Sequence, residues 1–276
     1  MKYKLIAADM DGTLLNDDSV ISERTRAAII KAIEAGALFV TATGRAIQGA
    51  EIINDLFEED MPFVVFNGAC AIMGKSRKTL FKVYMDFTLA KEVVAQGKSR
   101  SVCMVVWTDI GLRKILMENP PEEYLDYNLK YNQVDYKQII EVDEIADESI
   151  YKVLWFGNKE QVREYQEEMN GYFGGRVNCC SSLPELLEFV SPEADKGIAL
   201  EEIGKHFGID RSEMIAVGDG YNDISMLKYA GLGIAMGNAP DDVKAACDEV
   251  TLSNNNDGLA AVIEKYILCD ECKGNK

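Results

Sequence analysis

Short apolar runs alternate with amphipathic stretches near both ends of the chain. The runs at 4–8, 37–42 and 62–66 are mostly apolar, which is typical of strands buried on both faces of a sheet. Between the first two runs, 22–35 carries apolar residues at helical spacing, begins at a capping serine and stops at a glycine. A strand, a helix and a strand in this order predict a right-handed parallel crossover. The same reasoning predicts a helix at 47–57 and a hairpin with its turn at 74–78.

A similar alternation returns near the end of the chain. A helix is predicted from Lys196 to about residue 207, and an apolar strand at 214–217. The remaining elements are a helix at 224–229, a short strand within 231–237, and helices at 241–246 and 258–267.

The middle of the chain has a different texture, because its strands do not end in clusters of glycine and acidic residues. Strands are predicted at 102–107, 150–156, 176–180 and 186–190, with helices at 89–98 and 160–173 and a polar, tyrosine-rich stretch at 118–136. We therefore predict an α/β core with a parallel sheet, formed by 1–85 and 188–276, and an inserted α+β domain at 86–187.

The charge of the chain bears on the kind of partner that it can bind. A net charge of −17 disfavours a nucleic-acid or anionic-membrane surface as the main partner. If the substrate is itself an anion, a local cation and a specific Lys or Arg must offset this acidic field. The hydrophobic fraction of 47% is enough for a sizeable folded core.

Cysteine usage and the N-terminal residues bear on the compartment. The seven cysteines are odd in number, the N-terminus does not resemble a secretory signal, and no apolar run has membrane-spanning length. We expect a reducing cytoplasm and free thiols, including the C-x-x-C pair formed by Cys269 and Cys272.

Two carboxylates, Asp9 and Asp11, follow the first predicted strand, and Gly12 permits a tight turn after them. Ligands of open α/β sheets bind at the carboxyl ends of strands. Carboxylates this close repel each other unless a cation or a shared proton relieves them, and oxygen ligands favour Mg²⁺. Asp9 could serve only as a metal ligand, or it could attack phosphorus to form an aspartyl phosphate. Asp11 could protonate a leaving alkoxide and later deprotonate a water.

Polar groups also follow the next two strands. Thr43 and Gly44 offer a hydroxyl and backbone N–H groups that suit a phosphate oxygen, and Arg45 comes directly after them. Asn67 follows the third strand. Three successive strands with small or polar ends predict one shared site at one edge of the sheet.

The last part of the chain supplies the remaining candidates. A lysine at a helix start opposes the helix dipole, which is explained if Lys196 points at a bound phosphate. Asp219 follows the strand at 214–217 and is placed to join Asp9 around a cation. Asp223 could hold a metal-bound water or orient Lys196, and Asn222 could donate to phosphate.

Taken in order, these motifs resemble the haloacid dehalogenase (HAD) superfamily. The stretch Asn67-Gly68-Ala69 and the insert between Thr43 and Lys196 make the chain similar to the Cof-type phosphatases with a type IIB cap. The resemblance implies a Rossmann-like core with a mobile cap, and small phosphorylated metabolites as substrates: sugar phosphates, flavin precursors or pyridoxal phosphate.

The resemblance also implies roles for individual residues. Asp9 would be the nucleophile and Asp11 the general acid/base. Mg²⁺ would be held by Asp9, the backbone carbonyl of Asp11 and Asp219, with Asp223 in support. Phosphate would be held by the Met10 backbone N–H, Thr43, the Gly44 backbone, Lys196 and Asn222. We expect Arg45 and Asn67 to support the site.

These observations predict a Mg²⁺-dependent phosphomonoester hydrolase. Two alternatives stay open. One is a phosphomutase that uses the same residues on a sugar phosphate. The other is a non-catalytic sensor of a phosphometabolite, although simple binding would not need both Asp9 and Asp11.

Overall fold

The computed structural model describes residues 2–50, 53–54, 58–115, 122, 124 and 136–269. The chain divides into two compact units, one formed by Met1–Lys82 with Asp195–Lys276 and the other by Val83–Ala194. The sequence predicts these boundaries after residues 85 and 187. The later boundary differs because the strand Leu186–Val190 pairs with strands of the second unit.

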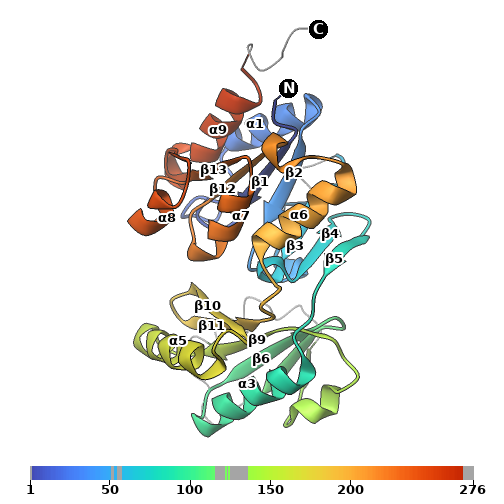
Figure 1. The fold of residues 1–276 in the computed structure, drawn as a ribbon, viewed down its shortest axis with the longest axis vertical. Coiled ribbons are helices and arrows are strands. Elements are labelled where there is room, and N and C mark those ends of the chain that lie inside the picture. The colour runs from blue at the N-terminus through green and yellow to red at the C-terminus, as the bar shows by residue number, and fades with distance from the viewer. Residues whose placement is uncertain are drawn as a thin grey trace. The chain divides into compact units, whose positions relative to one another are not determined.

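The first unit contains an eight-stranded sheet in the order β14-β13-β12-β1-β2-β3-β4-β5 (Figure 1). From β14 to β3 neighbouring strands are parallel, and the last two are added antiparallel as a hairpin. The strands are β1 (Leu5–Asp9), β2 (Leu38–Ala42), β3 (Pro62–Val65), β4 (Cys70–Met73), β5 (Thr79–Lys82), β12 (Met214–Gly218), β13 (Leu232–Ala235) and β14 (Glu249–Val250). This confirms the predicted α/β fold, including the hairpin.

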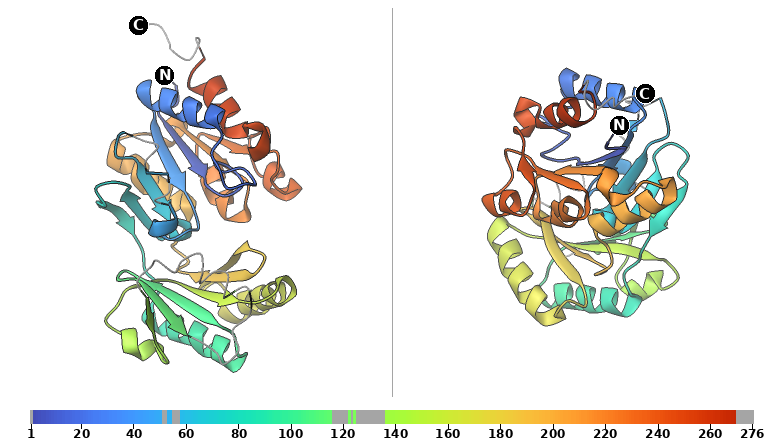
Figure 2. Two further views of the ribbon diagram at one scale, coloured as in Figure 1. Left: turned by 180° about the vertical axis from the view of Figure 1, so that it is seen from behind. Right: turned by 45° about the horizontal axis from the view of Figure 1, so that its top comes forward.

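Helices cover both faces of this sheet, as expected where parallel strands are apolar on both sides. Helices α6 (Lys196–Phe207) and α7 (Ile224–Tyr229) pack on the face that includes Leu5, Ala7 and Val40. The opposite face is covered by α1 (Glu23–Glu34) and α9 (Gly258–Tyr266) (Figure 2). The short helices α2 (Ile47–Ala50) and α8 (Asp241–Ala245) complete the unit. Much of the remainder of the helix predicted at 47–57 lies outside the described residues.

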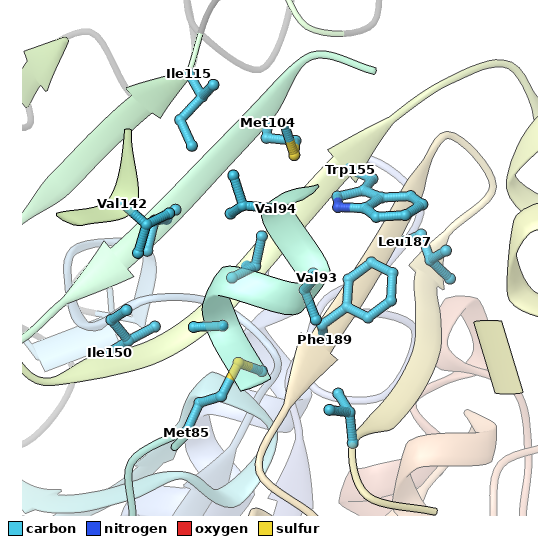
Figure 3. Close-up of a cluster of buried hydrophobic side chains, with 14 of the residues drawn as sticks. Met85, Val93, Val94, Met104, Ile115, Val142, Ile150, Trp155, Leu187 and Phe189 are labelled. Carbon is cyan, nitrogen blue, oxygen red and sulfur yellow. The ribbon is translucent and has the colours of Figure 1, made fainter. Parts of the chain in front are cut away.

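The second unit contains a six-stranded sheet in the order β10-β11-β9-β6-β7-β8. Its elements are β6 (Met104–Thr108), β7 (Leu112–Ile115), β8 (Tyr136–Gln138), β9 (Ile150–Phe156), β10 (Asn178–Leu183), β11 (Leu186–Val190), α3 (Phe87–Ser99) and α5 (Lys159–Phe173). Trp155 and Phe189 lie at the centre of its hydrophobic core, with ring centroids 4.6 Å apart (Figure 3). Strands β7 and β8 were not predicted, and most of 118–136 lies outside the described residues.

The cysteines depart from expectation at one position. Cys70, Cys103, Cys179, Cys180 and Cys247 are not in disulfides. Cys269 is disulfide-bonded. The prediction of a reduced thiol at Cys269 is therefore wrong. Within the described part of the chain, no helix is long and apolar enough to cross a membrane. The cytoplasmic location stays a prediction.

Candidate active site

The predicted site residues meet because their strands are neighbours in the sheet. Strand β1 lies between β12 and β2, and all three run parallel. Asp9 is the last residue of β1, Thr43 follows β2, and Asp219 follows β12. The sheet order therefore brings segments more than 150 residues apart in sequence to one edge.

Lys196 is the centre of this edge. It is the first residue of α6, and its side chain is fully buried. Its Nζ lies 2.6 Å from Asp9 Oδ1 and 2.6 Å from Asp223 Oδ1. Burial alone would lower the pKa of Lys196, but the two carboxylates outweigh it and raise that pKa above its ordinary value. The lysine is therefore a protonated bridge between β1 and the loop that precedes α7.

Asp223 also shapes the loop after β12. Its Oδ2 accepts hydrogen bonds from the backbone N–H groups of Asp219, at 3.0 Å, and Gly220, at 2.8 Å. A Cβ at Gly218 would lie 2.6 Å from the Asp223 carboxyl group, so only glycine allows this close approach. Asp223 thus orients both Lys196 and the backbone that carries Asp219.

Two residues to which sequence reasoning gave no role hold the Asp219 carboxylate. Thr13 donates from Oγ1 to Asp219 Oδ1 at 2.9 Å. Asn238 donates from Nδ2 to Asp219 Oδ2 at 3.3 Å and to the Gly12 carbonyl at 2.8 Å. Thr13 stands inside the predicted motif, whereas nothing in the sequence around Asn238 indicated this contact.

Three carboxylates form a cluster that could hold a metal ion. Oxygens of Asp9, Asp219 and Asp223 lie within 4.8 Å of one another. Burial and the charge of Asp223 raise the pKa of Asp9, although Lys196 opposes this shift. The same two causes raise the pKa of Asp219 to about 6. One lysine against three carboxylates leaves excess negative charge, so this all-oxygen donor set fits a hard divalent cation such as Mg²⁺.

Asp11 stands apart from that cluster. Its side chain is 51% exposed, and Arg45 donates to both of its carboxylate oxygens. The Arg45 side chain also donates to the Gly49 carbonyl, and its backbone N–H donates to Thr43 Oγ1. The structure therefore places the Asp11 carboxylate beside the Thr43-Gly44-Arg45 loop. The expectation that Asp11 contacts a metal ion through its backbone carbonyl stays a prediction.

The remaining predicted residues lie around the same edge. Met10 is buried and follows Asp9 directly. Asn222 donates from Nδ2 to Asn67 Oδ1 at 3.0 Å. Gly44 lies against Asn67, because a Cβ there would come within 2.8 Å of Asn67 Oδ1. The predicted phosphate-binding and supporting residues thus come from one sheet edge, but their roles stay predictions.

A mostly parallel sheet with an acidic cluster and a buried lysine at its strand ends forms an α/β site suited to phosphoryl chemistry. The family model for haloacid dehalogenase-like hydrolases matches residues 6–263. The chain therefore belongs to the haloacid dehalogenase-like hydrolases, and the predicted superfamily is confirmed.

Individual relatives agree with this assignment. The chain is 31% identical over 285 residues to the 5-amino-6-(5-phospho-D-ribitylamino)uracil phosphatase YwtE of Bacillus subtilis, covering 96% of this chain and 98% of the relative. A haloacid dehalogenase-like hydrolase from Bacteroides thetaiotaomicron matches with a TM-score of 0.82 and 30% identity, covering 96% and 99% of the two chains. A sugar phosphatase described as HAD subclass IIB matches with a TM-score of 0.81 and 25% identity, covering 95% and 98%. The predicted class, a phosphatase of the HAD type, is confirmed.

Proposed function

We propose that this protein is a Mg²⁺-dependent phosphomonoester hydrolase that acts on small phosphorylated metabolites through an aspartyl phosphate at Asp9. The observation that carries the proposal is the position of Asp9. It lies at the end of β1, within 2.6 Å of a buried lysine and inside a cluster of three carboxylates. Phosphoryl transfer depends mainly on positioning and charge stabilisation, and this arrangement supplies both.

Asp9 is the nucleophile in this proposal. The contact between Lys196 and Asp9 Oδ1 fixes the carboxylate, so that its second oxygen can attack phosphorus in line with the ester bond. As the bond from Asp9 to phosphorus forms, the bond to the ester oxygen breaks. The leaving alkoxide takes a proton from Asp11. In the second step a water attacks phosphorus and gives a proton to Asp11, the bond between phosphorus and Asp9 breaks, and inorganic phosphate leaves with Asp9 regenerated.

The residues that would hold the cation are Asp9, Asp219 and the backbone carbonyl of Asp11. Bound Mg²⁺ supplies positive charge beside the transferring phosphoryl group. Lys196, Thr43, Asn222 and the strand-end amides would neutralise and orient the phosphoryl oxygens. The net charge of −17 disfavours large polyanions, which agrees with a small substrate.

The substrate class rests on the relatives. One is named for a phosphoribitylamino-pyrimidine and another is described as a sugar phosphatase. Both names describe phosphate esters of small polyhydroxylated molecules. We therefore propose sugar phosphates or similar metabolites as the substrates of this chain.

The test is hydrolysis of p-nitrophenyl phosphate and of a panel of phosphorylated metabolites, with Mg²⁺ and with EDTA. We expect Asp9→Asn to abolish phosphate release. The matched control is Asp18→Asn, because Asp18 is an exposed acid in the loop after the same strand. If Asp9→Asn hydrolysed the aryl phosphate at the parental rate, the assigned nucleophile would be wrong. Conversion to an isomeric sugar phosphate without release of free phosphate would replace the hydrolase by a mutase.

A further inference from the structure

Three consecutive residues after β3 have positive φ angles, which residues other than glycine rarely adopt. Phe66, Asn67 and Gly68 have φ values of 53°, 56° and 96°. Positive φ is uncommon for asparagine and rare for a bulky residue such as phenylalanine. Strained backbone of this kind persists only where its surroundings over-determine it, and it concentrates at functional sites.

The surroundings of this segment hold it in place from two sides. The backbone N–H of Phe66 donates to the Arg45 carbonyl at 2.9 Å, and that of Asn67 donates to the Thr43 carbonyl at 3.2 Å. On the other side, a Cβ at Gly68 would overlap the backbone of Asp195 at the start of α6. The segment is therefore clamped between the loop after β2 and the helix that begins with Lys196.

This clamp delivers the Asn67 side chain to Asn222. Asn67 is 4% exposed, and its Oδ1 accepts the 3.0 Å hydrogen bond from Asn222 Nδ2. Gly44 leaves room for the same oxygen, since a Cβ at that position would crowd it. We propose that Asn67 is a positioning residue that orients the Asn222 amide for binding of the substrate phosphate.

The amide chemistry gives the reason. An asparagine amide has an acceptor oxygen and a nitrogen with two N–H donors. When one N–H of Asn222 is committed to Asn67, the rotation of the amide is fixed and the second N–H has a defined direction. A phosphate oxygen needs donors and is repelled by a carbonyl oxygen. Asn67 thereby determines which end of Asn222 faces the phosphate. This inference rests on the proposed function, in which Asn222 binds phosphate.

The test is a double-mutant cycle of Asn67→Gly and Asn222→Ala, read by calorimetric binding of inorganic phosphate in saturating Mg²⁺. Glycine at 67 removes the acceptor and tolerates the positive φ. We expect each single variant to weaken phosphate binding about tenfold, the size of one hydrogen bond to a charged group. The double variant should bind phosphate no more weakly than Asn222→Ala alone, because Asn67 acts through Asn222.

Arg77→Gly is the matched control. Arg77 lies in the turn between β4 and β5 and has a φ of 60°, close to that of Asn67. Glycine at position 77 therefore makes the same change at a residue with positive φ, but away from the site. It should leave phosphate affinity unchanged. If thermal melting shows that Asn67→Gly is partly unfolded at the assay temperature, the cycle is measured at a lower temperature at which all variants are folded. Additive losses in the double variant, or full phosphate affinity in Asn67→Gly, would overturn the proposal.

The phosphate-binding readout also separates two kinds of failure. If the wild-type protein binds phosphate but hydrolyses no phosphomonoester, the proposed function fails while the cycle still tests Asn67. If the wild type is an active phosphatase and the cycle is additive, the function stands and the positioning role fails.

Discussion

Arg45 donates two hydrogen bonds to the carboxylate of Asp11, from Nε at 2.8 Å and from Nη2 at 2.5 Å. The guanidinium is mostly buried, whereas the carboxylate is half exposed. A bidentate pair of this kind fixes the plane of a carboxylate as well as its position. Arg45 therefore fixes the orientation of the Asp11 carboxylate, which stays accessible.

The contact between Arg45 and Asp11 predicts that the loss of activity in Arg45→Lys depends on the leaving group of the substrate. Lysine keeps the charge but cannot form the bidentate pair, so Asp11 loses its fixed orientation. We expect kcat to fall about tenfold to a hundredfold for an alkyl phosphate, whose leaving group needs a proton. Hydrolysis of p-nitrophenyl phosphate should fall much less, because its leaving group is stable as an anion. Equal losses on both substrates would argue against this role of Asp11.

Removal of Lys196 should affect both stability and activity. In Lys196→Met the buried carboxylates of Asp9 and Asp223 lose their shared partner. We expect the free energy of unfolding to fall by about 3 kcal/mol and kcat to fall at least about a hundredfold. Denaturant melts and initial rates measure the two effects. Lys205→Met, on the exposed side of the same helix, should change stability by less than about 1 kcal/mol and leave the rate intact.

The raised pKa of Asp219 predicts how Mg²⁺ stabilises the protein at different pH. Burial and Asp223 move this pKa from 3.8 to about 6, so the folded state binds the proton more tightly than the unfolded chain. The metal-free protein should therefore lose about 3 kcal/mol of stability as the pH rises from about 4 to 6. Because Mg²⁺ binds the ionised form, its effect on Tm should be larger at about pH 7.5 than at about pH 5. Thermal melts in Mg²⁺ and in EDTA test this, and an equal gain at both pH values would contradict it.

Gly12 allows a steric test of the cation site. Gly12 and Gly36 have φ values of 83° and 93°, so alanine is strained at either position by about 1 to 2 kcal/mol. The two positions differ in their surroundings. A Cβ at Gly12 would overlap the Asp219 carboxylate, whereas a Cβ at Gly36 would meet nothing within 4 Å. We expect Gly12→Ala to weaken Mg²⁺ binding at least about tenfold, measured by calorimetry. Gly36→Ala should lose stability but keep its Mg²⁺ affinity.

Local pattern was sufficient for most of the fold. The apolar runs predicted β1, β2 and β12 because strands buried on both faces need continuous hydrophobic sequence. The same pattern does not predict β7, because its sequence Leu-Arg-Lys-Ile has two charged residues in the middle of the strand. Arg113 forms a buried ion pair with Glu148 there, and a partner 35 residues away in sequence leaves no local signal.

In the candidate site, too, local pattern predicts some features and tertiary contacts decide the others. The sequence by itself determined the chemistry at the strand ends: Asp9, Asp11, Thr43, Lys196 and Asp219 each end a strand, follow one or open a helix, and such positions are set by local pattern. Only the tertiary structure decided which groups touch. It assigned Arg45 to Asp11, Asn67 to Asn222, and Asn238 to Asp219. Side-chain contacts of this kind depend on sheet order and loop conformation, which join residues far apart in the chain, and no local pattern of apolar and polar residues encodes them.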